Sequence, residues 1–594
     1  MTYRDAPYYP IIYVRGFAMN LEAVDLAVSD PYTGFNEGSV SFRKSVNADD
    51  PPKHVFESPV IRLSKEFGYT DTYSNGVDLI AKKRSSSLPV RSLIIYPYYD
   101  DSAPIFGGES IAAIEDLAKG LSELIADVKD LITRDPENQM TDEDFRCYLV
   151  AHSMGGLICR AFLQNPALDE NNTSRYVDKV FTYGTPHNGI DLKVFRNLLY
   201  IRFRRILNVD VSGWHQTSNF HRARMAEYLD IKNLYDKQDK RLGRRVNWLT
   251  RFPADRFFCL IGTNYRDYHV AAGISRFLAG NESDGLVRIE NASLFGVDNN
   301  MEFGQITQCP ENRIYKTHSG PLGLVNSMEG YEQLIRFLFG SLRLDISANW
   351  RRPGGAMGRT DFTPPSGGGQ GGSPPGSWHG GNFPPGDFDA LYPIEFSARS
   401  LGKLWEFTRL STDQGSAAYV NSEDLVEGLD RSYLATIFLR NELDAIENGN
   451  TFSLGLSFGI RAPDYETEDG LWLDDHYEGW YLFQDQVELQ IQWPEQENSI
   501  GFINYRWQSS GRTGQTPLYG RDMQSVDLPI EGQEAGNPAQ GLHIIISKWN
   551  EEAASPGLSG LAERDVYDNP SPGSAPGARQ RDTEEEQGTM EMAV

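Results

Sequence analysis

A serine lies between an apolar run and a helix-like segment, in a pattern that could supply a nucleophile. Residues 145–151 (FRCYLVA) are apolar enough for a buried strand, and HSMGG follows at residues 152–156. A nucleophile on a sharp strand-to-helix turn stands clear of the sheet, and small residues beside it avoid collisions. Ala151 occupies the first small position, where such turns usually have glycine. The pattern predicts a reactive hydroxyl at Ser153.

This segment resembles the nucleophile turn of the α/β-hydrolase superfamily, and two further segments resemble its lipase-like branch. YGTPHNG at residues 183–189 is similar to the GTPHxG segment of bacterial triacylglycerol lipases and lipid-deacylating relatives. YVRGF at residues 13–17 has Arg15 where such lipases carry His before Gly. Because the oxyanion donor there is a backbone N–H, its role survives this change, whereas substrate preference stays open. The resemblance covers residues 8–345.

The resemblance implies that an acid and then a histidine follow the serine, because a serine hydroxyl is a weak nucleophile without an imidazole base. The ten histidines stand at positions 54, 152, 187, 215, 221, 269, 318, 379, 476 and 543. Two precede Ser153, and three lie in or beyond a Gly/Pro-rich segment. For the four at positions 187, 215, 221 and 269, the acid would have to stand earlier in the chain than the loop that supplies it in lipase-like sequences. His318, in YKTHSG at residues 315–320, is therefore the expected base.

The expected acid is Asp284, in NESDGLV at residues 281–287, which is similar to the NDGLV-type segment that carries the aspartate in bacterial lipases. Asp267, which follows the apolar run 257–261 more closely, is the alternative. A buried, ionised acid orients the imidazole and stabilises its cation. The resemblance places the oxyanion hole at the backbone N–H groups of Met154 and Phe17.

The elements that must position these residues alternate between strand-like and helix-like patterns. Short apolar runs occur at residues 11–14, 93–96, 145–151, 180–183 and 257–261. Between the second and third runs, apolar residues recur every three to four positions from 111 to 131, which is typical of an amphipathic helix. Buried strands alternating with helices predict an α/β fold, a mostly parallel sheet with helices on both faces. Residues 330–344 are expected to form a last helix.

Composition divides the 594 residues into four parts. Residues 1–350 form the expected α/β-hydrolase domain, and residues 351–386 a linker, since 19 of the 34 residues from 353 to 386 are Gly or Pro. Residues 387–550 alternate β-branched and aromatic residues with polar ones, as in FSLGLSFGI, which favours an antiparallel β-sandwich-like module. Residues 551–594 are acidic and poor in apolar residues, and we expect them to be disordered.

A cap insertion is expected at residues 190–256, where lipase-like hydrolases carry a lid. Residues 191–256 contain 15 Lys or Arg and 7 Asp or Glu, a net charge of +8. The stretch 194–207 (VFRNLLYIRFRRIL) is apolar and basic, as in a helix that meets a lipid surface. Residues 391–550 have a net charge of −15, so the cap could instead dock on this module. Both alternatives remain open at this point.

Charge and cysteine content exclude several classes of function. The net charge of −26 makes nucleic acid an improbable partner. Four cysteines without a CxxC pair exclude a disulfide scaffold and a cysteine zinc site. The sequence begins without a signal-peptide pattern and has no run of 18 apolar residues, so a cytoplasmic location is expected, with export by a non-classical route not excluded. The acidic loop 464–475 lacks ordered calcium-ligand spacing.

Together these patterns predict a serine hydrolase that cleaves carboxylic esters of lipids or other lipophilic acyl compounds, with no cofactor and no metal. The basic cap suggests peripheral membrane contact. An acyltransferase with the same three residues is one alternative. An interaction protein that uses the β-rich module, with the hydrolase domain as a scaffold, is another.

Overall fold

The computed structural model describes 21 segments of the chain. They are residues 7–16, 34–36, 38–42, 53–74, 77–78, 87–96, 113–190, 219–238, 243–267, 282–297, 306–320, 322–350, 391–421, 429–446, 451–461, 465–467, 475–477, 481–494, 499–519, 523–530 and 539–550. Phe17, the stretch 194–207, the expected linker 351–386 and the expected tail 551–594 lie outside these residues. No helix within the described segments is long and apolar enough to cross a membrane.

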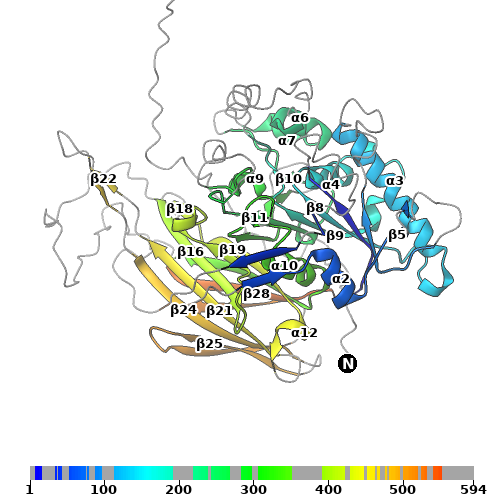
Figure 1. Ribbon diagram of the computed structural model, residues 1–594. Helices are drawn as coiled ribbons and strands as arrows, with labels where there is room; N and C mark the ends of the chain where they lie inside the picture. The colour runs from blue at the N-terminus through cyan, green and yellow to red at the C-terminus, as the bar shows by residue number, and fades with distance from the viewer. Residues whose placement is uncertain are drawn as a thin grey trace, which may run out of the picture.

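A seven-stranded parallel sheet forms the centre of the first domain (Figure 1). Its order is β14 (Glu311–Ile314), β11 (Phe257–Gly262), β9 (Val177–Tyr183), β8 (Cys147–His152), β1 (Ile11–Val14), β7 (Ser92–Ile95) and β4 (Thr70–Asp71). Every pair of neighbours in this sheet is parallel. The central strands are buried along nearly their whole length, which explains their continuous apolar sequence. This confirms the predicted α/β sheet.

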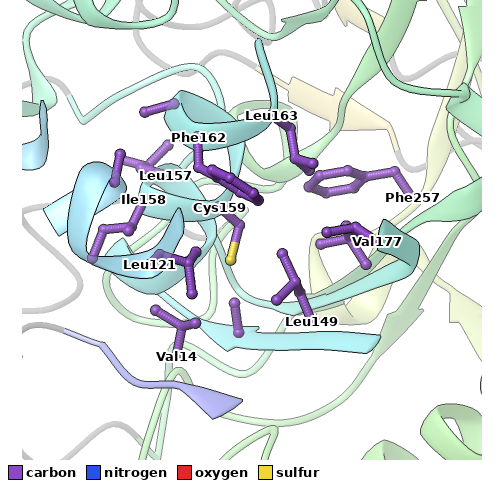
Figure 2. Packing of buried hydrophobic residues seen from close by; sticks show 14 of the residues in the cluster. Val14, Leu121, Leu149, Leu157, Ile158, Cys159, Phe162, Leu163, Val177 and Phe257 are labelled. Atoms are coloured by element: carbon purple, nitrogen blue, oxygen red, sulfur yellow. The ribbon is translucent and has the colours of Figure 1, made fainter. Parts of the chain in front are cut away.

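Helices cover both faces of the sheet. On one face, α3 (Ile114–Thr133) and α4 (Met154–Gln164) pack against alternate strand residues such as Val14 and Leu149. Figure 2 shows how Leu121 of α3 and Cys159 of α4 fill this layer. On the other face, α2 (Pro59–Phe67) and α10 (Met328–Phe339) cover the residues that point the opposite way. Smaller elements of the domain are β2 (Ser39–Phe42), β3 (Lys53–Phe56), β5 (Tyr73–Ser74), β6 (Val77–Asp78), α6 (Arg222–Tyr228), α7 (Lys232–Lys237), β10 (Trp248–Leu249), α9 (Ile289–Ala292), β12 (Phe295–Val297) and β13 (Ile306–Gln308).

The β-rich module consists of two antiparallel sheets that share one apolar core, as predicted for a sandwich. One sheet has the order β19 (Arg431–Leu439), β15 (Leu342–Trp350), β28 (Ala539–Lys548) and β27 (Met523–Pro529). The other contains β17 (Thr408–Leu410), β16 (Leu391–Ser400), β21 (Thr451–Arg461), β24 (Tyr481–Gln492), β25 (Gly501–Trp507) and β26 (Thr513–Leu518), with β18 (Ala418–Asn421) and β20 (Ala445–Ile446) paired to it. A separate hairpin joins β22 (Tyr465–Thr467) and β23 (Asp475–Tyr477).

Two expectations about the end of the first domain need correction. The last helix ends at Phe339, whereas the sequence pattern predicted a helix to residue 344. Residues 342–350, which were assigned to the first domain, form β15 and pair with β19 and β28 of the β-rich module. The physical reason is the alternation in LRLDISANW, which buries every second side chain at its start in the sandwich core. The module therefore begins before the Gly/Pro-rich segment.

The β-rich module covers the edge of the parallel sheet. Thr408 Oγ1 accepts the backbone N–H of Arg313 at 3.0 Å and donates to its carbonyl oxygen at 3.3 Å. The hydroxyl of Tyr433 accepts the N–H of Glu311 at 2.9 Å and lies 3.0 Å from the carbonyl oxygen of that residue. Two side-chain hydroxyls thus take the place of a neighbouring strand along β14, whose backbone groups would otherwise be unpaired.

A buried ion pair reinforces this contact. Arg336 of α10, 1% exposed, makes two hydrogen bonds of 2.7 Å to the carboxylate of Asp444 in the module. Phe337 and Phe258 of the first domain pack against Phe438 of β19, with ring centroids 5.2 and 5.9 Å apart. Because β14 precedes His318 and α10 follows it, the module contacts the elements on both sides of that histidine.

Replacing Thr408 by valine is expected to lower the free energy of unfolding by about 1–3 kcal/mol, because the N–H and carbonyl groups of Arg313 lose their partner. Urea unfolding followed by tryptophan fluorescence measures the change. Thr513→Val, at an exposed position on β26, is the matched control and should change stability by less than about 0.5 kcal/mol. Equal effects of the two variants would show that the hydroxyl of Thr408 does not stabilise the sheet edge.

Candidate active site

Ser153 lies between β8 and α4 with backbone dihedrals of φ 53° and ψ −123°. A positive φ at a residue other than glycine costs energy, and such strain is common where a side chain must be presented for chemistry. Its carbonyl oxygen accepts hydrogen bonds from Gly156 N–H at 3.1 Å and from Thr185 Oγ1 at 2.9 Å. These contacts hold the strained turn, and Ser153 is 8% exposed.

Glycines allow neighbouring segments to approach this turn closely. A Cβ atom at Gly155 would lie 2.1 Å from the carbonyl oxygen of Val14. One at Gly156 would lie 2.1 Å from Thr185 Oγ1. Contacts this short cannot form, so only glycine fits at either position without moving β1 or the loop after β9. The small residues of HSMGG are therefore required by packing, as predicted from the sequence.

The structure brings together the three residues that the sequence analysis selected as nucleophile, base and acid. His318 Nε2 lies 2.9 Å from Ser153 Oγ, and His318 Nδ1 lies 2.8 Å from Asp284 Oδ2. With Nδ1–H donating to the carboxylate, Nε2 is free of hydrogen and can accept the serine proton. His318 is 3% and Asp284 1% exposed, so the chain of hydrogen bonds is shielded from water.

The environment of Asp284 orients its carboxylate toward His318. Its Oδ1 accepts the backbone N–H groups of Leu286 at 3.0 Å and Val287 at 2.8 Å, which leaves Oδ2 for the imidazole. Gly285 has a φ of 101°, which makes the tight turn possible. The alternative acid, Asp267, instead accepts a hydrogen bond from Asn264 Nδ2 at 2.8 Å. The structure therefore pairs His318 with Asp284.

Only one of the two expected oxyanion donors can be placed. Met154 is the first residue of α4, so its N–H is among the four at the start of a helix that have no partner within the helix. The positive end of the helix dipole adds to its attraction for a negatively charged oxygen. Phe17 lies outside the described residues, and its assignment stays a prediction. The preceding Gly16 lies against Ser153, because a Cβ atom there would be 2.9 Å from Ser153 Cβ.

Gly184, within YGTPHNG, supports the site in a way that the sequence did not predict. It has a φ of 56°, and a Cβ atom there would lie 3.0 Å from Asp284 Oδ2 and 3.1 Å from His318 Nδ1. The glycine therefore leaves space for the hydrogen bond between these two residues. The neighbouring Thr185 donates a hydrogen bond from Oγ1 to the carbonyl oxygen of Ser153.

Gly184→Ala is expected to lower kcat by about 10–100-fold, because the added methyl group displaces the imidazole or the carboxylate and small displacements of reacting groups are costly. Initial rates with a soluble ester measure the effect. Gly511→Ala is the matched control, since Gly511 has a similar φ of 66° and open space around its Cβ position. It carries the same backbone strain, so an equal loss of kcat in both variants would contradict the steric explanation.

The end of the expected cap insertion is hydrogen-bonded to α4, the helix that follows Ser153. Arg160 of α4 is fully buried and donates to the carbonyl oxygens of His187 at 2.9 Å, Val246 at 3.0 Å and Trp248 at 2.9 Å. Burial lowers the pKa of its guanidinium to about 10. Basic residues in the described part of the cap pair with acids of the first domain, as Arg224 does with Glu115. These pairs do not use the acidic β-rich module.

Within the described segments, no three His, Cys, Asp or Glu residues form a group that could hold a metal ion. The four cysteines are buried, and burial raises the pKa of the Cys147, Cys159, Cys259 and Cys309 thiols. Such thiols are poor nucleophiles.

Comparisons with known proteins give distant structural likenesses. No family model matches the chain, and no curated protein matches it significantly. It is similar to the lipase BlEst2 of Bacillus licheniformis in its mature form, with 16% identity, 57% of this chain and 95% of that chain covered, and a TM-score of 0.28. It is also similar to the phospholipase PlaB of Legionella pneumophila, with 12% identity, 80% and 89% covered, and a TM-score of 0.29.

The parallel sheet, its two helical layers and the strand–serine–helix turn are those of the α/β-hydrolase fold. The fold resemblance inferred from the sequence is thereby confirmed, and it rests on this chain's own topology.

Proposed function

We propose that this protein is a serine hydrolase that cleaves carboxylic esters of lipids or other lipophilic acyl compounds through an acyl-enzyme on Ser153. The observation that supports the proposal most is the chain of hydrogen bonds from Ser153 through His318 to Asp284. In this arrangement the imidazole activates the serine hydroxyl for attack on a carbonyl carbon, and the carboxylate orients the imidazole.

In the acylation step, Ser153 Oγ forms a bond to the ester carbonyl carbon while His318 Nε2 takes the hydroxyl proton. Asp284 keeps the imidazole in the required tautomer and stabilises its cation. The N–H groups of Met154 and Phe17 donate to the oxyanion of the tetrahedral intermediate. The bond to the alkoxy oxygen then breaks, and His318 returns the proton to the departing alcohol.

In the deacylation step, water attacks the acyl-enzyme while His318 Nε2 takes a proton from it. The bond between Ser153 Oγ and the acyl carbon breaks, the carboxylic acid leaves, and the serine recovers its proton. An acyltransferase would use an alcohol in place of this water. The same three residues serve both reactions, so hydrolysis and acyl transfer differ only in whether water or an alcohol accepts the acyl group.

Labelling with a fluorophosphonate, followed by an ester panel, tests the proposal. We expect stoichiometric labelling at Ser153 and hydrolysis of p-nitrophenyl esters that becomes more efficient with longer acyl chains. An interaction protein with an inactive hydrolase domain would take up no label. Transfer to an added alcohol that exceeds hydrolysis in dilute aqueous solution would support the acyltransferase instead.

The lipophilic substrate class also suggests contact between the cap and a lipid surface. Replacing Arg202, Arg204 and Arg205 by glutamine is expected to weaken binding to anionic vesicles, because each basic residue near such a surface contributes about 1 kcal/mol. Vesicle co-sedimentation at two salt concentrations measures binding, and hydrolysis of a short soluble ester should stay nearly unchanged. Vesicle binding equal to that of the wild type would contradict a lipid-facing cap.

A further inference from the structure

His152, the residue before the nucleophile, contacts the proposed base directly. Its Nε2 lies 2.9 Å from the main-chain carbonyl oxygen of His318, across 166 residues of sequence. The two imidazole rings also pack together, with centroids 4.9 Å apart and an interplanar angle of 41°. His152 precedes Ser153, so chain order excludes it as the base, and the sequence indicates no other role for it.

The hydrogen bond fixes the protonation of the His152 ring. A carbonyl oxygen can only accept, so Nε2 must carry a hydrogen and donate it. Removal of the ring from water, together with the neighbouring His318, lowers the pKa of His152 to about 3. The ring is therefore neutral near pH 7, with its single hydrogen directed at His318 O. A ring in this state supplies a fixed donor and does not carry a proton between reacting groups.

The main chain of His318 is consequently held on both sides. Its N–H donates to the carbonyl oxygen of Asp284 at 2.9 Å, and its carbonyl oxygen accepts from His152. The side chain is held by Asp284 Oδ2 and Ser153 Oγ. His318 follows the edge strand β14, and its N–H bonds to the segment that carries Asp284. The bond from His152 connects the loop that contains His318 to β8, the strand that carries the nucleophile.

The opposite side of the His152 ring faces the first loop of the domain. A Cβ atom at Gly16 would lie 2.9 Å from His152 Nδ1, so the loop after β1 packs directly on the ring. The imidazole thus lies between the segment that precedes the expected oxyanion donor and the segment that carries the base. Its Nε2–H makes the hydrogen bond to the segment that carries the base.

We propose that His152 is a positioning residue, which holds the His318 loop at the distance that proton transfer from Ser153 requires. This inference rests on the proposed function, because it assigns His152 a role in the same site. Its neutral Nε2–H is the operative group, and contact of the ring alone is not sufficient.

Two substitutions separate the hydrogen bond from the ring. His152→Gln keeps an N–H donor near the position of Nε2 and removes the ring, whereas His152→Phe keeps a ring and removes the donor. We expect His152→Phe to lower kcat for a soluble ester by about 10–100-fold with little change in KM, since the base is displaced and binding groups are untouched. We expect His152→Gln to retain kcat within about threefold, because the donor is preserved.

Several outcomes would overturn the inference. Wild-type kcat in His152→Phe, or a loss in His152→Gln as large as in His152→Phe, would show that the hydrogen bond does not position the base. If His152→Phe does not fold, His152→Leu takes its place with the same expected loss. His543→Phe, on β28 in the β-rich module, is the control and should leave kcat unchanged. Failure of wild-type protein to take up a fluorophosphonate would overturn the proposed function itself, a result distinct from these.

Discussion

Ser153→Ala is expected to lower the rate of ester hydrolysis by about 10⁶-fold, the scale observed when the nucleophile of such a triad is removed. The reason is that the Ser153 hydroxyl, the imidazole of His318 and the carboxylate of Asp284 act as one unit. Without the hydroxyl, His318 has no nucleophile to activate. Initial rates with a p-nitrophenyl ester measure the change. Residual hydrolysis should come only from substrate binding and the oxyanion donors.

Ser122→Ala provides the matched control. Ser122 is also a buried serine of the first domain, and its hydroxyl donates to Asp169 at 2.7 Å, away from the candidate site. It should lower stability slightly and leave kcat unchanged. Wild-type turnover in purified, folded Ser153→Ala protein would refute the assignment of the nucleophile.

Asp284→Asn is expected to lower kcat by about 10⁴-fold, the effect of removing the charge of a triad aspartate. An asparagine can present its NH₂ group to His318 Nδ1, which favours the imidazole tautomer with hydrogen on Nε2. That tautomer cannot accept the proton of Ser153. The amide also fails to stabilise the imidazolium cation that forms during catalysis.

Asp267→Asn is the control for this second large effect, because Asp267 was the alternative acid and its carboxylate accepts from Asn264 in the structure. It should change kcat by less than about threefold. A large loss in Asp267→Asn together with a mild loss in Asp284→Asn would reverse the assignment of the acid.

The proposed reacting residues could be selected from the sequence because local patterns and a family resemblance indicate them. Ser153 follows an apolar strand and precedes glycines, and these residue types at this spacing have few other uses. Asp284 and His318 were chosen through the family resemblance, and their hydrogen bonds now show that they lie next to Ser153. Phe17 lies outside the described residues, so the second oxyanion donor remains a prediction.

The supporting residues were not predictable, because their roles depend on contacts between segments far apart in the sequence. Gly184 is needed because the Asp284–His318 pair occupies the space beside it, which no local pattern reveals. His152 bonds a residue 166 positions away. Strand β14, with the mixed sequence ENRI, has no alternation or apolar run that would indicate a strand. It is a strand because β11 pairs with it and the β-rich module covers its other edge.

The domain boundary was misplaced for a related reason. The Gly/Pro-rich segment is the clearest compositional change in the chain. However, it lies between β15 and β16, which both belong to the β-rich module, and not between the two domains. Cleavage in that segment would therefore leave both fragments with strands of one sandwich. Composition identifies a linker, but only strand pairing identifies which elements it joins.

Rapid-quench mass spectrometry during turnover of a p-nitrophenyl ester tests for an acyl-enzyme on Ser153, because it locates the acyl group. The proposed acyl-enzyme predicts a burst of p-nitrophenol equal to one equivalent of enzyme wherever deacylation limits the rate. It also predicts one acyl group on the tryptic peptide of residues 147–160, CYLVAHSMGGLICR, attached to Ser153. Turnover at the same rate with no acyl group on this peptide, or with the group on another residue, would contradict an acyl-enzyme on Ser153.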